Sequence, residues 1–432
     1  MSQITLHSPT QPIVASVAVP GSKSYTNRAL LMAALASGTS RLTSVSPSTD
    51  CEALVRALRT LGVSVTEPNA STIVVDGCGG NFSQTRATID VGPAGTTMRF
   101  LTALCAAIPG IEVTLRGSER MHIRPIGDLV EALRQAGAAI DYLLREGCPP
   151  LRLHSTHPLK GRGISLNGST SSQFISALLL ASPLFADGLD VTIQGTQIST
   201  SYIDMTIQSL ADFGVEVSHT NYARFEVPPG QTFRARDYRV EGDASGASYL
   251  WALAAISAGT ITVHNINPGS AQGDINFPAL LEKMGCSVRK DARSITVSGT
   301  NHLRSIEADM SLMPDTAQTL ATVAACAEGT TVIRGLSTLK VKETDRLEAL
   351  RAELSKMGIQ ADTGPDYIAV HGGTPRPAQI ATYDDHRMAM SFAILAVRTG
   401  NLRIIDPKVV EKSFPDFWQT LAYLGIRSEG EE

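Results

Sequence analysis

The stretch Cys51–Val63 reads CEALVRALRTLGV, an amphipathic helix pattern followed by a glycine and an apolar residue. Glycine supplies the left-handed conformation that caps many helices at their C-termini, so a strand is predicted to begin directly afterwards. The same step returns about every 70 residues, a period too long for a solenoid repeat. Its six glycines are Gly62, Gly137, Gly214, Gly285, Gly358 and Gly425. The predicted helices before them are Cys51–Leu61, Ile126–Ala136, Tyr202–Phe213, Ile275–Met284, Glu343–Met357 and Phe414–Leu424.

A polar turn that contains glycine or serine opens a second, Ala- and Leu-rich helix before each of these steps. Short alternating segments such as Thr260–Val263 and Thr330–Ile333 are predicted strands. Each unit therefore consists of a turn, a buried helix, a strand, a loop, an amphipathic helix and a strand. The sequence predicts an α/β protein of six such units in two sets of three. The buried helices and their turns are Gly21–Ala36, Ala94–Ala107, Gly168–Ala181, Gly242–Ser257, Met313–Ala327 and Asp384–Val397.

Composition and charge exclude several classes of protein. Of 432 residues, 43% are hydrophobic and 18% are charged, which suits a chain with a core and not a disordered one. The net charge of −4 provides no global basic field, so no nucleic-acid partner is expected. Apolar runs such as Ala29–Ala36 are far shorter than the ~18 residues that a membrane span needs. No secretory signal is visible at the N-terminus, so we expect a cytoplasmic protein without a membrane partner.

The cysteines give no sign of a metal site. The six cysteines are far apart, without a CxxC pair or a zinc-ligand spacing. Reduced thiols are the natural interpretation, although spacing alone leaves disulfides open. No metal is predicted.

The polar turns are candidate anion sites because helix N-termini carry unpaired N–H groups and a partial positive charge. Serine and threonine are also ordinary N-caps, and for any one turn that explanation is sufficient. Lys23 is different, since a cation at a helix N-terminus opposes the helix dipole and indicates an anionic ligand. The first three turns are Pro20–Arg28, Gly92–Arg99 and Gly168–Gln173.

Four charged clusters occupy equivalent places in the repeats, each near a predicted helix start. Taken singly, each could be a solvated charge run with local ion pairs. Their equivalent positions favour convergence on one site. The clusters are Arg120–Pro125, Lys340–Arg346, Asp384–Arg387 and Glu411–Pro415.

Seven motifs follow one another along nearly the whole chain: Pro20–Arg28 (PGSKSYTNR), Ala94–Arg99 (AGTTMR), Arg120–Gly127 (RMHIRPIG), Gly168–Phe174 (GSTSSQF), Glu241–Ser245 (EGDAS), Val341–Arg346 (VKETDR) and Asp385–Met390 (DHRMAM). This set resembles the 5-enolpyruvylshikimate-3-phosphate (EPSP) synthase family. The order of the first, sixth and seventh motifs is highly specific to that family.

The resemblance implies two similar domains, each of three βαβαββ units arranged as an inside-out α/β barrel. One domain would be residues 21–240, mainly binding shikimate 3-phosphate. The other would be residues 1–20 plus 241–432, contributing to phosphoenolpyruvate binding and catalysis. The family's ligands lie in the cleft between the domains. The reaction transfers the enolpyruvyl group of phosphoenolpyruvate to the 5-hydroxyl of shikimate 3-phosphate in aromatic amino acid biosynthesis. It uses no cofactor, and we expect a monomer.

The resemblance also implies the site residues. The catalytic groups would be Asp315 and Glu343 as candidate bases and Lys23 as a candidate acid. Several cations suit two phosphates and a carboxylate, because arginine binds such groups through paired donors. The shikimate 3-phosphate ligands would be Lys23, Ser24, Arg28, Ser171, Ser172, Gln173, Ser199, Tyr202, Asp315, Thr338 and Lys342. The phosphoenolpyruvate ligands would be Lys23, Gly95, Arg124, Gln173, Arg346, Arg387 and Lys412.

Three positions depart from the family pattern. Thr338 stands where some members carry Asn, Thr97 replaces the common Ala, and Phe100 replaces the common Pro. The last two lie in the helix start that shapes the pocket where the herbicide glyphosate competes with phosphoenolpyruvate. Altered glyphosate sensitivity is therefore a hypothesis, which an inhibition constant against phosphoenolpyruvate tests.

Two rival functions remain at this point. The sister family transfers enolpyruvyl to UDP-N-acetylglucosamine, but it normally carries a Lys-Asn pair at the first turn and a cysteine on a mobile loop. Here Ser24 follows Lys23, and Cys105 falls within a predicted buried helix. A repeat scaffold such as a nucleic-acid clamp is disfavoured by the net charge of −4.

Overall fold

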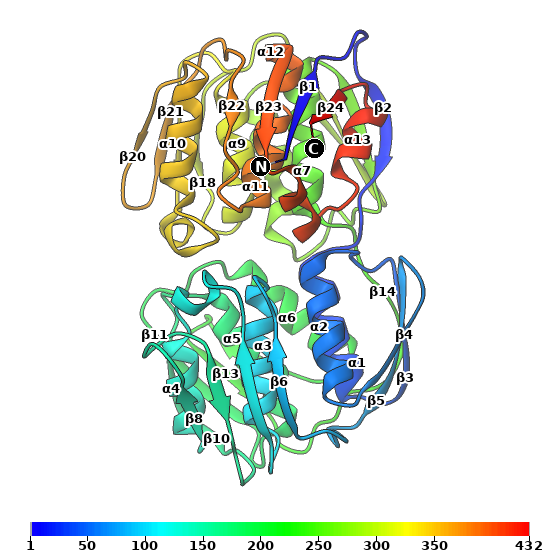
Figure 1. The fold of residues 1–432 in the computed structure, drawn as a ribbon, viewed down its shortest axis with the longest axis vertical. Coiled ribbons are helices and arrows are strands. Elements are labelled where there is room, and N and C mark those ends of the chain that lie inside the picture. The colour runs from blue at the N-terminus through cyan, green and yellow to red at the C-terminus, as the bar shows by residue number, and fades with distance from the viewer. Residues whose placement is uncertain (1, 432) are drawn as a thin grey trace. The chain divides into compact units, whose positions relative to one another are not determined.

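The computed structural model describes residues 2–431, and their contacts divide the chain into two units, each with its own core. One unit is Gly21–Val240, and the other joins the chain up to Pro20 to the chain from Glu241 onward. In Figure 1 the first runs from blue to green, and the second combines the blue N-terminal strands with the green-to-red part of the chain. Among the described residues no helix is long and apolar enough to cross a membrane.

The unit Gly21–Val240 contains three repeats. The first holds α1 (Lys23–Leu35), β3 (Ser37–Thr43), α2 (Thr49–Thr60), β4 (Ser64–Asn69), β5 (Thr72–Cys78) and β14 (Asp237–Arg239). The second holds β6 (Arg86–Asp90), α3 (Gly95–Ala106), β7 (Glu112–Arg116), α4 (Gly127–Gln135), β8 (Ile140–Tyr142) and β9 (Leu151–Leu153). The third holds β10 (Gly161–Asn167), α5 (Ser172–Ala181), β11 (Leu189–Gln194), α6 (Ser201–Asp212), β12 (Ser218–Thr220) and β13 (Arg224–Val227).

The other unit also contains three repeats. The first holds β2 (Val14–Ala18), α7 (Ala244–Ser257), β15 (Thr260–His264), α8 (Phe277–Lys283), β16 (Ser287–Asp291) and β17 (Ser294–Ser298). The second holds β18 (Glu307–Asp309), α9 (Ala317–Ala324), β19 (Thr330–Arg334), α10 (Arg346–Lys356), β20 (Ala361–Thr363) and β21 (Ile368–His371). The third holds β22 (Gln379–Ile380), α11 (His386–Ala393), α12 (Ala396–Thr399), β23 (Asn401–Ile405), α13 (Phe417–Tyr423), β24 (Arg427–Glu431) and β1 (Gln3–His7).

Every repeat forms one four-stranded sheet with the same topology. In the sheet β6-β7-β9-β8, for example, β6 and β7 are parallel and the remaining neighbours are antiparallel. The parallel pair is joined by the buried helix, as a crossover connection requires. The six predicted repeats and the α/β fold class are therefore confirmed.

Two strands pair with a different repeat from the one that follows them directly in the chain. β2 immediately precedes α1 in the chain, yet it pairs in parallel with β15 of the other unit. β14 precedes α7 but pairs in parallel with β3. The chain therefore passes between the units at Pro20–Gly21 and again at Val240–Glu241, and each unit is completed by a strand from a distant part of the sequence.

The glycines predicted to end the amphipathic helices adopt the left-handed conformation. Gly62 has a φ of 86° and Gly285 a φ of 109°, and the other four also have positive φ. A side chain at these positions would be strained, which explains why glycine recurs at this step. Several helix bounds differ from the prediction, and the helix expected from Phe414, for example, begins at Phe417. The helix expected from Glu343 begins at Arg346, because Asp345 caps it through the N–H groups of Leu347 and Glu348, and the helix expected over Asp384–Val397 divides into α11 and α12.

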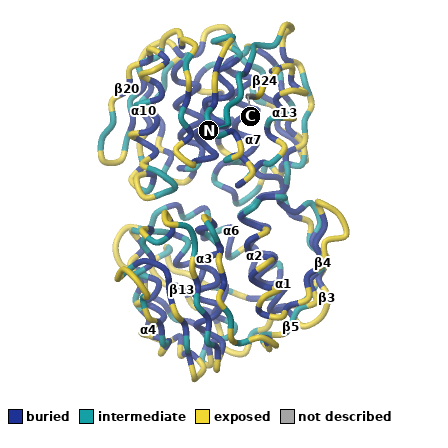
Figure 2. Tube along the Cα trace, viewed as in Figure 1, coloured by how far each residue is buried: buried dark blue, intermediate teal, exposed yellow. Residues whose placement is uncertain are grey.

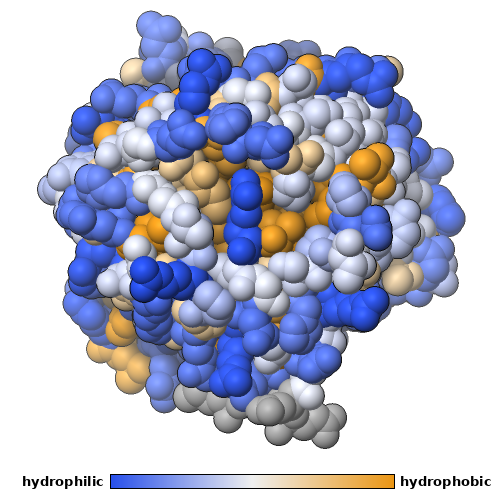
Figure 3. Space-filling model, turned by 90° about the horizontal axis from the view of Figure 1, so that it is seen from above, coloured by the Kyte–Doolittle hydropathy of each residue, from blue (hydrophilic) through white to orange (hydrophobic). Residues whose placement is uncertain are grey.

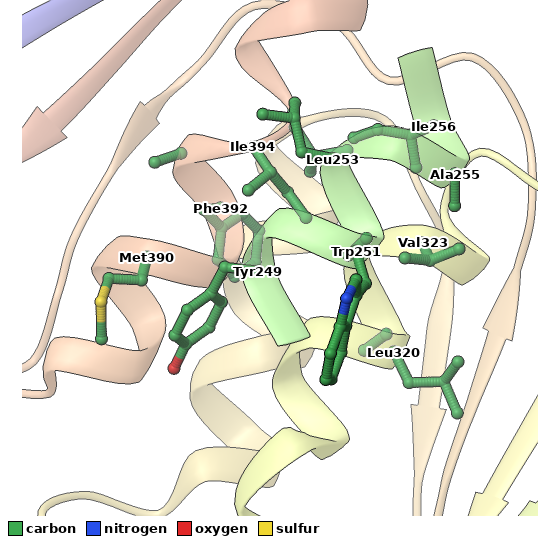
Figure 4. Packing of buried hydrophobic residues seen from close by; sticks show 14 of the residues in the cluster. Tyr249, Trp251, Leu253, Ala255, Ile256, Leu320, Val323, Met390, Phe392 and Ile394 are labelled. Carbon is green, nitrogen blue, oxygen red and sulfur yellow. The ribbon is translucent and has the colours of Figure 1, made fainter. Parts of the chain in front are cut away.

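The buried helices form the centre of each unit. In α7 every residue from Ala244 to Ile256 except Ser245 is buried, as expected for a helix that is apolar on all sides. Figure 4 shows side chains of α7 packed between those of α9 and those of α11. Trp251 is fully buried and donates from Nε1 to the Ile295 carbonyl at 3.2 Å.

The exposure of the residues agrees with this arrangement of inner helices and outer sheets. Figure 2 shows the buried residues gathered along the inner helices, with the exposed ones on outer strands and hairpin loops. Figure 3 shows one face on which hydrophilic residues surround a hollow lined by hydrophobic ones.

All six cysteines are free thiols, so none of them forms the disulfide that their spacing alone left open.

Candidate active site

The first polar turn places Lys23 at the start of α1, where Ser22 is the N-cap. Lys23 Nζ lies 3.3 Å from Asp50 Oδ2, on the first turn of α2. Asp50 is 3% exposed, and its Oδ1 has no hydrogen-bond partner among the described residues. Asp50 thus supplies part of the negative charge that offsets the unfavourable interaction of Lys23 with the helix dipole. Sequence reasoning missed this residue because nothing in the chain order links it to the first turn.

Arg28 is buried one turn further along α1. Its Nε donates to Thr206 at 2.8 Å, its Nη1 to the Ser24 carbonyl at 3.0 Å, and its Nη2 to Ser176 and the Tyr202 carbonyl. A guanidinium has five N–H groups, so one N–H on Nη1 remains for a ligand. Burial lowers the pKa of Arg28 to about 10. Arg28 therefore both joins α1, α5 and α6 and offers one donor.

Gly95 and Arg124 are in close contact at the start of α3. A Cβ on Gly95 would lie 2.7 Å from Arg124 Nη1 and 2.9 Å from Nη2, so any larger residue here would displace the guanidinium. Arg99 stabilises the backbone on both sides of this contact, because its guanidinium donates hydrogen bonds to the carbonyls of Gly95 and Pro125. Arg124 as a whole is buried, with a relative exposure of 9%. The structure thus brings these two predicted ligands together.

The third turn joins the second within the same unit. Ser171 is the N-cap of α5, and Gln173 Nε2 donates to Thr96 Oγ1 at 3.4 Å. Ser172 is buried at the helix start, and Ser199 has a left-handed φ of 52° just before α6. Hydroxyl, amide and backbone N–H groups therefore predominate in this half-site, which we call the hydroxyl half-site: Lys23, Ser24, Arg28, Gly95, Arg124, Ser171, Ser172, Gln173, Ser199 and Tyr202.

Two of the three departures from the family pattern, Thr97 and Phe100, lie on α3 beside this half-site. Thr97 Oγ1 donates to the Asp50 carbonyl at 3.2 Å. Phe100 is 1% exposed, and the Arg28 guanidinium carbon lies 5.4 Å from the centre of its ring. The helix α3 thereby supports both Asp50 and Arg28.

The other unit holds a denser cluster centred on Asp315. Its carboxylate accepts from Arg346 Nη1 at 3.2 Å and from Arg387 Nη2 at 2.9 Å, and Lys342 Nζ lies 3.9 Å away. Glu343 accepts from Arg346 Nη2 at 2.9 Å and from Lys412 Nζ at 2.7 Å. Predicted ligands from four separate segments therefore converge.

Arg346 is the centre of this arrangement. Its side chain is 2% exposed and also binds Asp385, with Nε 2.7 Å from Oδ2. Burial by itself lowers the pKa of Arg346, but the carboxylates of Asp385, Glu343 and Asp315 together raise it above its ordinary value. The guanidinium is therefore always charged. We call this set the ionic half-site: Asp315, Lys342, Glu343, Arg346, Asp385, Arg387 and Lys412.

Cations outnumber carboxylates in the ionic half-site, with Lys342, Arg346, Arg387 and Lys412 against Asp315, Glu343 and Asp385. Such a cluster has room for an added anion. Thr338, predicted as a ligand in this unit, has a buried hydroxyl without a hydrogen-bond partner among the described residues. Within residues 2–431 no group of three or more His, Cys, Asp or Glu side chains is placed to hold a metal ion.

Two acidic residues of this region were not predicted as site residues. Asp385 lies in a quoted motif, and it both binds Arg346 and caps α11 by accepting from the Arg387 N–H at 2.8 Å. Asp274 is 5% exposed and accepts a hydrogen bond from Ser245 Oγ, while its Oδ1 has no hydrogen-bond partner among the described residues. Burial, and next the negative charge of Asp315, raises the pKa of Asp274 to about 7. Only the fold reveals it, because Asp274 is remote in sequence from the motifs.

The fold and the two half-sites define an α/β enzyme of small anionic substrates. The family model for EPSP synthase (3-phosphoshikimate 1-carboxyvinyltransferase) matches residues 7–421. The chain belongs to the EPSP synthase family. It is 45% identical to the 3-phosphoshikimate 1-carboxyvinyltransferase of Pectobacterium atrosepticum, covering 98% of both chains. It is 46% identical to that of Serratia proteamaculans, covering 96% of this chain and 97% of the relative.

A solved structure of EPSP synthase from Acinetobacter baumannii superposes with a TM-score of 0.83 at 26% identity, and each chain is covered completely. This likeness supports the same arrangement of repeats over the full length. The family resemblance seen in the seven motifs is confirmed.

Proposed function

We propose that the protein performs the reaction of its family with the two half-sites described above. It transfers the enolpyruvyl group of phosphoenolpyruvate to the 5-hydroxyl of shikimate 3-phosphate, a step of aromatic amino acid biosynthesis. The hydroxyl oxygen forms a bond to C2 of phosphoenolpyruvate while C3 gains a proton. The tetrahedral intermediate then returns a C3 proton to the surroundings and loses inorganic phosphate, which leaves the enol ether.

The observation that carries this proposal is the excess of cations in the ionic half-site. Phosphoenolpyruvate brings a carboxylate and a phosphate, and Arg346, Arg387 and Lys412 offer donors of matching charge. We assign Arg124, Gly95, Gln173 and Lys23 to the same substrate. Because Arg346, Arg387 and Lys412 are already held by carboxylates, they need little reorganisation as negative charge develops at the transition state.

Shikimate 3-phosphate suits the hydroxyl half-site. Its ring hydroxyls are neutral donors and acceptors, which match hydroxyl and amide side chains. Its phosphate suits Lys23 and the starts of α1 and α5, where backbone N–H groups are available. We assign to this substrate Lys23, Ser24, Arg28, Ser171, Ser172, Gln173, Ser199 and Tyr202, together with Asp315, Thr338 and Lys342.

The proton transfers require a base for the 5-hydroxyl and an acid for C3. Asp315 and Glu343 are the carboxylates at hand, at side-chain exposures of 17% and 14%. Lys23 is the candidate acid, since its side chain is only 15% exposed and its Nζ lies beside Asp50. The groups available in each half-site support these assignments.

The test is phosphate release from phosphoenolpyruvate, measured with shikimate 3-phosphate and separately with UDP-N-acetylglucosamine. We expect release only with shikimate 3-phosphate, and we expect Lys23→Met to abolish it. Release that depends on UDP-N-acetylglucosamine would establish the rival transferase instead. A near-normal rate in Lys23→Met would refute the assigned role of Lys23.

We also propose that the protein acts in the cytoplasm as a monomer without a nucleic-acid partner. The net charge of −4 supports the last point. Sedimentation equilibrium across a range of concentrations tests the oligomeric state, and a concentration-dependent rise in mass would contradict a monomer.

A further inference from the structure

Glu353 is a fully buried carboxylate that the proposed reaction does not use. It lies on α10 with a relative exposure of 0%. Its Oε1 accepts from Tyr383 Oη at 2.6 Å and from Lys356 Nζ at 2.8 Å. Its Oε2 accepts from Lys356 Nζ at 2.8 Å and from the Ala381 N–H at 3.1 Å. A buried charge is retained only where it is well paired, so this carboxylate holds the segment Ala381–Tyr383 firmly.

The residues held in this way adopt an unusual backbone. Tyr383 has a φ of 55° and Asp384 a φ of 54°, so two consecutive non-glycine residues are left-handed. This conformation is unfavourable for residues with a Cβ and persists only where the surroundings impose it. The next residue is Asp385, which binds Arg346 and caps α11.

Helix α10 contacts both sides of this strained pair. Arg346 and Glu353 are seven residues apart, two helical turns, and therefore lie on the same face of α10. Arg346 binds Asp385, which follows the pair, while Glu353 binds Ala381, which precedes it, and Tyr383 itself. One helix face thus fixes the whole segment Ala381–Asp385.

We propose that Glu353 and Tyr383 are positioning residues for phosphoenolpyruvate binding: they hold Ala381–Asp385 so that Asp385 orients Arg346 and the start of α11, which carries Arg387. The inference rests on the proposed function, because it takes these two arginines as phosphoenolpyruvate ligands. Neither Glu353 nor Tyr383 contacts substrate in this account.

Tyr383→Phe tests the proposal with the smallest change, because it removes only the hydroxyl that Glu353 accepts. We expect the KM for phosphoenolpyruvate to rise about tenfold, as for loss of a hydrogen bond to a charged group, with the KM for shikimate 3-phosphate unchanged. Glu353→Gln should show the same selectivity with a larger rise. The control is Tyr423→Phe, since Tyr423 is 70% exposed on α13 and should leave both constants unchanged.

The selective change in KM separates positioning from general support of the fold. If Tyr383→Phe and Glu353→Gln lower the melting temperature but leave the KM for phosphoenolpyruvate unchanged in the folded enzyme, the proposal is overturned. An equal rise in both KM values also overturns it. Failure of the proposed function is distinguishable, since the unmodified protein would then release no phosphate from the two substrates.

Discussion

The two half-sites hold their cations in different ways. In the hydroxyl half-site Arg28 is bound by two hydroxyls and two backbone carbonyls, and Lys23 lies beside the carboxylate of Asp50. In the ionic half-site Arg346 alone binds three carboxylates, those of Asp315, Glu343 and Asp385. Neutral partners leave the charge of a cation available, whereas carboxylates orient it and partly neutralise it.

This difference matches the substrates that we assign. A polyhydroxylated ring is recognised by hydrogen bonds of fixed direction, so hydroxyl groups on helix starts are suitable. A small molecule with two anionic groups needs cations that are rigidly placed before it arrives. Loss of an acidic residue should therefore destabilise the ionic half-site more than loss of Asp50 destabilises the hydroxyl half-site.

Replacing one acid of the ionic half-site, and the acid beside Lys23 of the hydroxyl half-site, tests this difference most severely. Asp385→Ala removes the closest partner of buried Arg346 and the cap of α11, so we expect a loss of about 3–5 kcal/mol in the free energy of unfolding. Asp50→Ala should cost less, about 1–2 kcal/mol, because the Lys23–Asp50 distance is longer and Lys23 is partly exposed. Urea denaturation measures both, and equal losses would contradict the proposed difference.

The pH dependence of stability provides the next test, through Asp274. Its pKa is raised from 3.8 to about 7 in the folded protein, so folding favours the protonated acid. The contribution of protonated Asp274 to the free energy of unfolding is complete below pH 4 and is lost as the pH rises to about 7. This contribution is at most about 4 kcal/mol. Asp274→Asn should lack this slope and become the more stable protein at pH 8.

The measurement for Asp274 is the difference in unfolding free energy between variant and unmodified protein from pH 4 to pH 8. Taking the difference removes the contributions of all other titrating groups. A difference that stays constant across this range would show that Asp274 titrates normally in the folded state.

A smaller effect is expected in the hydroxyl half-site from Gly95→Ala. The added Cβ would displace the Arg124 guanidinium, so we expect the KM for phosphoenolpyruvate to rise about tenfold, or 1.4 kcal/mol, with little change in stability. Gly246→Ala is the matched control, because a Cβ there would meet Phe414 at 3.5 Å and Asp243 at 3.7 Å, both ordinary contact distances. Unchanged kinetics in Gly95→Ala would show that Arg124 does not act on phosphoenolpyruvate.

The sequence was sufficient for the repeats because each repeat contains its own local signals. The cap at Gly62 and the buried helix at Ala29–Leu35 follow from glycine geometry and apolar patterning, which need no distant contact. The exchange of β2 and β14 between the units could not be derived from the repeat itself, since it depends on pairing between distant segments. The family resemblance supplied only the domain bounds, residues 21–240 and residues 1–20 plus 241–432.

The site divides in the same way. Cations such as Lys23 and Arg346 lie in quoted motifs, and their unusual positions at helix starts could be recognised in sequence. Asp50 and Asp274 could not, because an acidic residue in a loop or helix looks the same whether or not a cation or a second acid lies beside it. The strained conformation of Tyr383 likewise appears only once the backbone is known.

The central claim is that phosphoenolpyruvate is bound mainly by the cations of the ionic half-site, with Arg124 and Lys23 as additional ligands, and that shikimate 3-phosphate is bound mainly by the hydroxyl half-site. The steady-state kinetics of Lys412→Met and Ser172→Ala test this claim most directly. We predict that Lys412→Met raises the KM for phosphoenolpyruvate at least tenfold and leaves that for shikimate 3-phosphate unchanged, while Ser172→Ala has the opposite selectivity with a rise of about fivefold. Variants that raise both KM values equally, or that reverse this pattern, would contradict the account.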